Sequence, residues 1–163
     1  IPMQQGWYGI IDCARDPRLI GMVERSPARL CLFKGRSLSR AVLETAPWLV
    51  RLDPGSELLN AWQREGRGAS WGIMVYSALD LPGLQRLFRR FLQVKLPDGT
   101  IALFRFYDPR VFATYLHAGT AEERAPRVAG GDQYSVEGPG GARGHQFRWW
   151  EGRLFDGDRA VND

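Results

Sequence analysis

The stretch LFRFYDPR, residues 103–110, carries an apolar segment directly into Asp108-Pro109, and an amphipathic segment follows it. An Asp at the N-cap accepts hydrogen bonds from the free amides of the first helical turn, and its charge suits the positive helix end. Pro at the first helical position lacks only an amide hydrogen that would be unbonded anyway. The stretch therefore predicts a strand that ends near Tyr107 and a helix that begins after Asp108.

The same junction occurs twice more, at Asp16-Pro17 and at Asp53-Pro54. Each copy again stands between an apolar stretch and an amphipathic one. Repeated passage from strand to helix is typical of α/β proteins, whose helices pack against a sheet. We therefore expect an α/β fold with a mixed central β-sheet and helices on both faces.

The spacing of the apolar residues supplies the other elements. The clearest helix follows Asp80, because the apolar positions after it recur at intervals of three and four residues: Leu84, Leu87, Phe88, Phe91 and Leu92. A β-hairpin is expected from residues 94–96 and 101–107, joined at Asp98-Gly99. Further strands are expected at residues 7–13, 28–33, 47–52 and 71–76, and further helices at residues 19–23, 38–44, 58–66, 111–116 and around Glu122.

The chain changes character at Gly130, where glycine-rich segments begin to alternate with short apolar ones. These segments predict strands at residues 134–137, 146–150 and 153–155. A length of 163 residues fits one domain. We expect residues 1–128 to form an α/β core and residues 129–163 to form a small β-rich C-terminal appendage and tail of the same domain.

Composition argues against several classes of partner. The net charge is +4, but the arginines are spread among 18 acidic residues, so we expect ion pairs in solvent and no nucleic-acid partner. No apolar run approaches the roughly 20 residues that cross a bilayer, and no secretion signal opens the sequence. We therefore expect a cytoplasmic protein without a membrane partner. Cys13 and Cys31 lie in apolar stretches and are expected to be reduced, unless their strands are neighbours.

No familiar catalytic or cofactor motif is present. His117 follows the last apolar residue of an expected helix, where a cation suits the helix end. His145 has no Cys or carboxylate at ligand spacing, so a zinc site is not expected. Residues 66–71 lack the third small residue of a dinucleotide fingerprint, and residues 138–144 lack the ending of a P-loop. We therefore expect a protein that is not an enzyme and that has no catalytic residue, cofactor or metal.

Arg105 is the one unusual charge. On the expected strand 101–107 it shares a face with Ile101, Leu103 and Tyr107. A guanidinium buried among such neighbours needs a carboxylate or several carbonyls as partners. Asp12 and Asp53 stand at the ends of expected strands and are the plausible partners. The pattern favours a buried ion pair that joins strand ends, with a contact to a ligand or a partner as the alternative.

Six segments in order carry a resemblance to a known family. They are residues 11–19 (IDCARDPRL), 32–35 (LFKG), 46–52 (APWLVRL), 71–73 (WGI), 92–99 (LQVKLPDG) and 104–110 (FRFYDPR). Together they resemble the adaptor-chaperone family of bacterial type VI secretion over roughly residues 7–137. The resemblance implies a cytoplasmic adaptor that binds a secreted toxin effector and helps to load it onto a VgrG or PAAR spike protein. It also implies that Asp12, Arg105, Tyr107 and Asp108 are a structural signature.

Two groups of side chains are candidates for contacts with such partners, because Trp, Tyr and Arg are enriched at interfaces. One group is the basic helix face of Arg86, Arg89 and Arg90, and the other is the tail segment of Arg148, Trp149 and Trp150. Simple solvation of the arginines, and packing of one Trp in a strand with the other half exposed, are the alternatives. For the whole protein, the alternative function is a small-ligand-binding or hydrolytic α/β enzyme that uses a crevice near Arg105.

Overall fold

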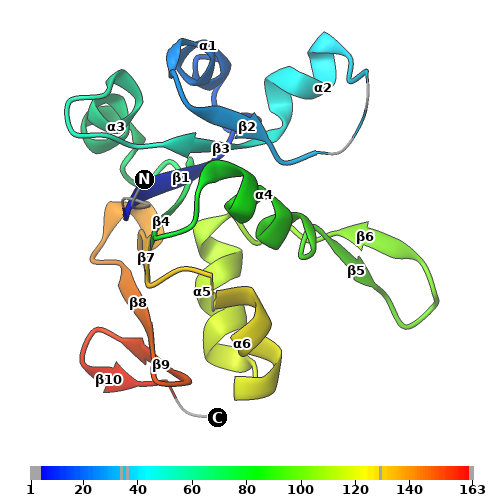
Figure 1. Ribbon diagram of the computed structural model, residues 1–163, viewed down its shortest axis with the longest axis vertical. Helices are drawn as coiled ribbons and strands as arrows, with labels where there is room; N and C mark the ends of the chain where they lie inside the picture. The colour runs from blue at the N-terminus through cyan, green and yellow to red at the C-terminus, as the bar shows by residue number, and fades with distance from the viewer. Residues whose placement is uncertain (1–4, 34, 36, 129, 162–163) are drawn as a thin grey trace.

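The computed structural model describes residues 5–33, 35, 37–128 and 130–161. Eight strands form one sheet in the order β10-β9-β8-β7-β4-β1-β3-β2, and β5 and β6 form a second, two-stranded sheet (Figure 1). The strands are β1 Gly6–Asp12, β2 Arg29–Cys31, β3 Pro47–Arg51, β4 Gly72–Ser77, β5 Gln93–Lys95, β6 Ile101–Leu103, β7 Gln133–Val136, β8 His145–Trp150, β9 Arg153–Asp156 and β10 Arg159–Ala160.

Helices flank the main sheet on both faces, as the sequence predicts. They are α1 Leu19–Arg25, α2 Arg40–Thr45, α3 Glu57–Ala61, α4 Leu81–Arg89, α5 Pro109–Ala118 and α6 Ala121–Val128, with a short π-helix η1 at Trp62–Gly66 and a 3₁₀ turn η2 at Pro139–Gly141. None of these helices has both the length and the apolar character that a bilayer crossing requires within the described part of the chain.

Two hydrophobic clusters cover the two faces of β1, because successive side chains of a strand point to opposite faces. Ile10 joins the cluster that contains Phe88 of α4 and Phe112 of α5. Ile11 joins the other cluster, which contains residues of α1 and α3. The α/β class with a central sheet between helices is therefore confirmed. The strand directions differ from the mixed sheet that we expected, because each pairing in the sheet is antiparallel.

The three Asp-Pro junctions all stand between a strand and a helix, but only the third caps its helix directly. Asp108 is the N-cap of α5, where its side chain accepts a hydrogen bond from the amide of Arg110 at 2.9 Å. Asp16 instead closes a turn before α1 by accepting from the amide of Arg18. Helix α3 is capped by Ser56. The junction therefore marks the change of direction, and local turn geometry decides which residue caps the helix.

The expected strand 101–107 is shorter than predicted and ends at Leu103. Two successive turns follow, in which the amide of Phe106 donates to the carbonyl of Phe104 and that of Asp108 donates to the carbonyl of Arg105. Phe106 and Tyr107 are consecutive and both buried. A strand with one solvated face could not bury both of them, because it would point them to opposite sides. Ile101 and Leu103, expected to share a buried face with Arg105, are exposed instead.

The C-terminal region is rich in strands, as expected, and it continues the main sheet. β7 pairs with β4, and β8, β9 and β10 follow in order. Gly130 is the first described residue of this region, and residues 129, 162 and 163 lie outside the described residues. The short strand β10 is an addition to the elements that the sequence predicts.

Both cysteines are free thiols, as expected. Cys13 is buried, and burial raises the pKa of its thiol to about 12. A thiol of this kind remains protonated at neutral pH and behaves as a small apolar group.

Candidate functional site

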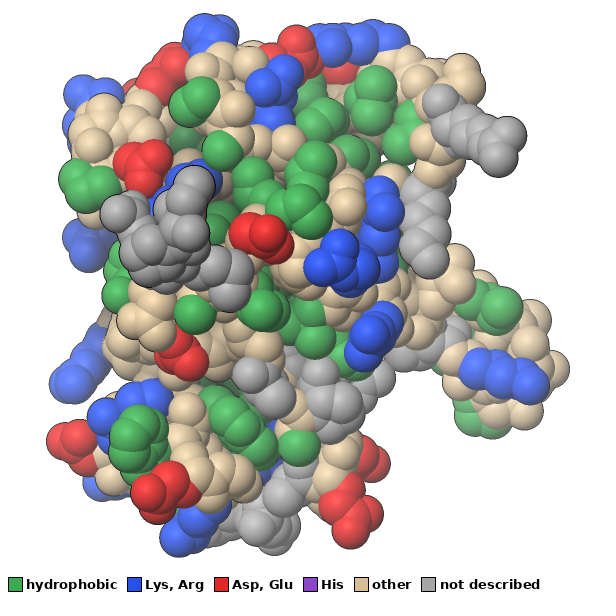
Figure 2. All heavy atoms as spheres, in the orientation of Figure 1, with side chains coloured by type: hydrophobic (Ala, Val, Ile, Leu, Met, Phe, Trp, Pro, Cys, Tyr) green, Lys and Arg blue, Asp and Glu red, His purple; other side chains and the backbone are tan. Residues whose placement is uncertain are grey.

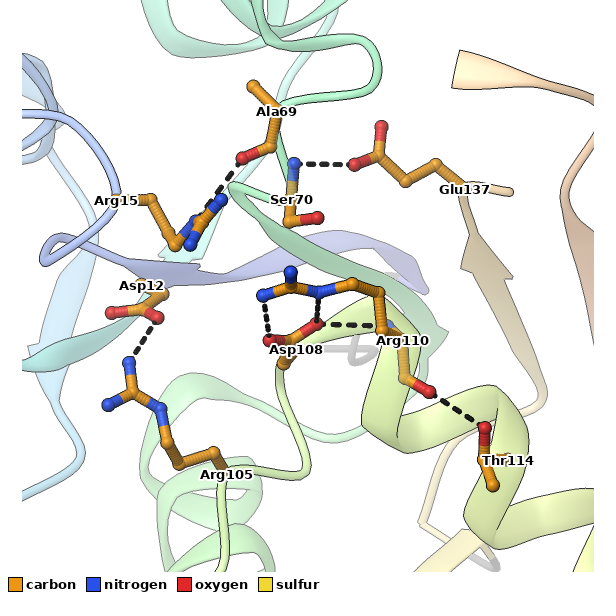
Figure 3. Close-up of polar contacts among 9 residues, drawn as sticks. All are labelled: Asp12, Arg15, Ala69, Ser70, Arg105, Asp108, Arg110, Thr114 and Glu137. Carbon is orange, nitrogen blue, oxygen red and sulfur yellow. Dashed lines mark hydrogen bonds and ion pairs between the residues drawn. The ribbon is translucent and has the colours of Figure 1, made fainter. Parts of the chain in front are cut away.

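The structure brings Asp12 and Arg105 together, 93 positions apart in the sequence. Asp12 is the last residue of β1, and Arg105 lies in the turns between β6 and α5. The guanidinium Nη2 donates to Asp12 Oδ2 at 2.7 Å, as Figure 3 shows. The other carboxylate oxygen, Oδ1, accepts from the amide of Ala14 at 3.1 Å. Asp12 therefore closes the turn after β1 and also anchors the segment that carries Arg105.

The ion pair is unequal in burial. The Asp12 side chain is 1% exposed, whereas that of Arg105 is 48% exposed. The expectation of an Asp12 partner for Arg105 is confirmed, but that of a buried guanidinium is wrong. The reason is that Arg105 lies in a turn at the surface and reaches inward only with its end. Asp53, the other expected partner, pairs with Arg51. The hydrogen bond to Asp12 raises the pKa of Arg105, so the guanidinium remains charged.

Asp108 is bound from two directions by Arg110. The guanidinium of Arg110 donates to both carboxylate oxygens, at 3.0 and 2.7 Å, in addition to the amide contact described above. Burial opposes the charge of Asp108, but these hydrogen bonds outweigh burial and lower its pKa. The carboxylate is therefore ionised at neutral pH and serves as the cap of α5.

Tyr107 is the aromatic member of the predicted signature and is buried. Its ring lies against Phe106, and the guanidinium carbon of Arg105 is 5.9 Å from the centre of the Tyr107 ring. Burial raises the pKa of Tyr107 to about 12. The phenol is therefore neutral, and the residue acts as part of the core beneath the Asp12–Arg105 pair.

Neighbouring contacts fasten a loop to the same region (Figure 3). Glu137 follows β7, and its carboxylate accepts from the amides of Gly68 and Ser70 at 2.8 and 2.7 Å. Arg15 donates to the carbonyl of Ala69 at 3.3 Å. The carboxylates of Asp12, Asp108 and Glu137 are thus all hydrogen-bond acceptors for arginines or backbone amides. Such an arrangement holds loops and helix ends in place, and it suits a structural signature better than acid–base chemistry.

The predicted basic helix face is divided by the structure. Arg86 and Arg90 are exposed on or just after α4. Arg89 is partly buried and donates to the carbonyls of three successive residues that end β2 and follow it, Cys31, Leu32 and Phe33. Arg89 therefore ties α4 to the edge of the sheet, whereas Arg86 and Arg90 face solvent.

The predicted tail segment is divided in the same way by the alternation of β8. Trp149 is half-buried and packs against the larger hydrophobic cluster. Trp150 is 60% exposed. Arg148 is exposed, and its guanidinium carbon lies 5.6 Å from the centre of the Phe155 ring on β9. The exposed part of this segment consists of Arg148 and Trp150.

The hairpin of β5 and β6 is a surface that the sequence pattern did not single out. It projects from the body of the protein, and Figure 2 shows hydrophobic side chains on it. Leu96, Ile101 and Leu103 are 41%, 68% and 46% exposed. Gly99 adopts a φ of +88° in the connecting turn, which confirms the role predicted for Asp98-Gly99. Apolar residues in a strand usually indicate burial, so the pattern of residues 101–107 did not predict that Ile101 and Leu103 would be exposed.

A second arrangement absent from the predictions joins His117, His145 and Asp156. Asp156 Oδ2 lies 3.2 Å from His117 Nε2 and 2.6 Å from His145 Nδ1. The sequence expectation that His145 lacks a nearby carboxylate considered only spacing along the chain. The antiparallel pairing of β8 with β9 brings Asp156 beside it.

A groove of about 510 Å³ borders Glu137, and Arg105 is not among its lining residues. It is lined by η1, β7 and the glycine-rich segment 141–144, with Trp62, Arg67 and Glu137 among its residues. This groove is therefore not the crevice beside Arg105 that the alternative enzyme function requires.

Comparison with known proteins identifies one family. The family model described as "Domain of unknown function (DUF4123)" matches residues 7–126, which is most of the chain. Neither the comparison with curated proteins nor that with solved structures found a match.

Proposed function

We propose, from the premise that this chain belongs to the family Domain of unknown function (DUF4123), that it is a cytoplasmic adaptor of bacterial type VI secretion. In this proposal it binds a secreted toxin effector and assists its loading onto a VgrG or PAAR spike protein. It acts by contact with proteins and catalyses no reaction. The six sequence segments that resemble the adaptor-chaperone family support this proposal, because all of them lie within the residues that the family model matches.

The observation that carries the proposal is the projecting hairpin. Within the described residues, β5 and β6 pair only with each other, so both outer edges present unpaired backbone groups. Exposed edges accept an extended segment of another protein as an added strand. The apolar side chains of Leu96, Ile101 and Leu103 supply contact area beside those edges. A hairpin of this kind fits an apolar, extended segment of an effector.

The exposed parts of the two predicted groups offer additional contacts. Arg86 on α4 and Arg90 just after it present positive charge, and Arg148 and Trp150 present a basic and aromatic pair on β8. In the proposal these residues contribute to the spike or effector interface. Arg89 is excluded from that role because its guanidinium is occupied by backbone carbonyls.

The first test is a comparison of captured proteins. The tagged full chain is expressed in its native bacterium, and the proteins that co-purify are identified by mass spectrometry. We expect a secreted effector and a VgrG or PAAR protein. An Ile101→Ser/Leu103→Ser variant should lower the yield of the effector at least about tenfold, because loss of central apolar contacts of an interface costs more than about 1.4 kcal/mol.

Val42→Ser is the matched control, since Val42 is an exposed hydrophobic residue on α2 and not part of the hairpin. Its yield of effector should equal that of the wild type. Capture of neither an effector nor a spike protein by the wild type would rule out the adaptor function. Equal capture by the hairpin variant would instead place the interface elsewhere.

The alternative function, a small-ligand-binding or hydrolytic enzyme, rests on the half-exposed guanidinium of Arg105. An anion could approach it from solvent. The charge is already paired with Asp12, however, and the nearby carboxylates accept from arginines or amides. Turnover of a small substrate that disappears in Arg105→Ala while the variant stays folded would favour this alternative over the adaptor.

A further inference from the structure

His117, His145 and Asp156 come from three elements that are separate in sequence. His117 lies in the last turn of α5, His145 begins β8, and Asp156 ends β9. One potential ligand atom from each residue lies within 4.8 Å of the other two. The side chains remain open to solvent, with exposures of 45%, 34% and 23%. An ion could therefore reach them without any change in the fold.

The two imidazole rings rest on a rigid base. Phe147 is fully buried, and the ring of His145 stacks on it at 5.1 Å and 15°. The ring of His117 meets the same Phe147 edge-on at 5.4 Å. Packing of this kind restricts the rotation of both rings, so little entropy is lost when they bind a ligand.

One separation between the ligand atoms already fits tetrahedral coordination, and a second needs a small shift of the carboxylate. Two atoms that each lie about 2.0–2.1 Å from a zinc ion are about 3.3 Å apart. The separation of His117 Nε2 and Asp156 Oδ2 is 3.2 Å. The separation of His145 Nδ1 and Asp156 Oδ2 is 2.6 Å. The carboxylate oxygen would have to move about 0.7 Å away from His145 Nδ1 to reach the tetrahedral separation.

We propose that His117, His145 and Asp156 bind one divalent transition-metal ion, for which Zn²⁺ is the best match. Two imidazole nitrogens and one carboxylate oxygen form the three-residue set of an open zinc site, and solvent or a partner occupies the fourth position. The ion joins α5 to β8 and β9, so it fastens the C-terminal strands to the helical layer. This site is independent of the adaptor function and of the hairpin.

The test is zinc titration of the untagged full chain, followed by isothermal calorimetry and by metal analysis after dialysis. We expect one Zn²⁺ per chain. At free Zn²⁺ of about 100 times Kd, the melting temperature should rise by about 5–10 °C. Co²⁺ in the same site should give the intense visible absorption of a tetrahedral ion.

Two ligand variants and one control complete the design. His117→Gln and Asp156→Asn should each weaken zinc binding at least about tenfold and, at the same free Zn²⁺, reduce the gain in melting temperature to about half or less. Asp158→Asn changes an exposed acid two positions away and should bind as the wild type does. If His117→Gln and Asp156→Asn bind zinc as tightly as the wild type, or if the wild type retains no zinc, the proposal is wrong. His117 is exposed, so its variant remains informative even if Asp156→Asn unfolds.

Discussion

Asp12 illustrates how one buried carboxylate organises its surroundings. One of its oxygens closes the turn after β1, and the other holds Arg105 at 2.7 Å. A buried carboxylate requires such partners, because an unpaired charge in the interior is costly. This requirement allowed Asp12 and Asp53 to be named from the sequence as candidate partners of Arg105, and the structure selects Asp12. The exposure of Arg105 could not be foreseen, because it depends on where the β6 pairing ends.

The unequal burial leads to a prediction about the pair. Arg105→Ala leaves the carboxylate of Asp12 buried without its counterion. Loss of one partner from a fully buried pair costs about 3–5 kcal/mol, and the half exposure of Arg105 reduces this to about 1–2 kcal/mol, because water can enter. The free energy of unfolding in urea measures this cost.

A double-mutant cycle isolates the interaction. In an Asp12→Asn background the carboxylate charge is absent, so Arg105→Ala should cost less than about 0.5 kcal/mol. Arg15→Ala is the matched control, because Arg15 is exposed and only donates to a backbone carbonyl at 3.3 Å. An equal cost of Arg105→Ala in both backgrounds would show that the two side chains are not coupled.

At the scale of elements, apolar spacing predicted where strands and helices occur better than where they end. Helix α4 lies close to its predicted position, with Asp80 as its cap. Strand β6 is four residues shorter than expected, because Phe106 and Tyr107 turn into the core together. Alternation alone cannot detect such a turn, since the aromatic residues fit a strand equally well.

The alternation of β8 gives a prediction that separates two adjacent residues. Trp149→Ala removes a half-buried side chain from the larger cluster and should lower the free energy of unfolding by about 2 kcal/mol. Trp150 is 60% exposed, so Trp150→Ala should change the free energy of unfolding by less than about 0.5 kcal/mol. Thermal and urea unfolding measure both values. Similar losses for the two variants would contradict the alternation of buried and exposed side chains along β8.

At the scale of the whole molecule, the C-terminal strands are part of the main core. Tyr134 and Val136 of β7, Phe147 of β8 and Leu154 of β9 are buried in the larger cluster. β7 also covers the edge of β4. The expected boundary between residues 1–128 and 129–163 therefore divides a continuous sheet. The family match ends at residue 126, just before these strands.

Removal of residues 129–163 tests this unity. Each buried apolar side chain contributes about 1.5–3 kcal/mol, so loss of four of them costs about 6–12 kcal/mol, comparable to the whole stability of a domain. The fragment 1–128 should therefore fail to show a cooperative thermal transition by circular dichroism. A cooperative transition near that of the full chain would show that the strands form a separate appendage.

Residue chemistry and local spacing are enough to predict the local features of this protein: the α/β class, the Asp108 cap and the Asp-Gly hairpin turn. They also limit the expected carboxylate partners of Arg105 to Asp12 and Asp53. These follow from residue chemistry and from spacing over a few turns or strand positions. The folded structure was needed to establish the choice of Asp12 over Asp53, the antiparallel order of the sheet, the exposure of the β5–β6 hairpin and the meeting of His117, His145 and Asp156. Those features depend on pairings between segments distant in the chain, and local spacing carries no information about which segments become neighbours.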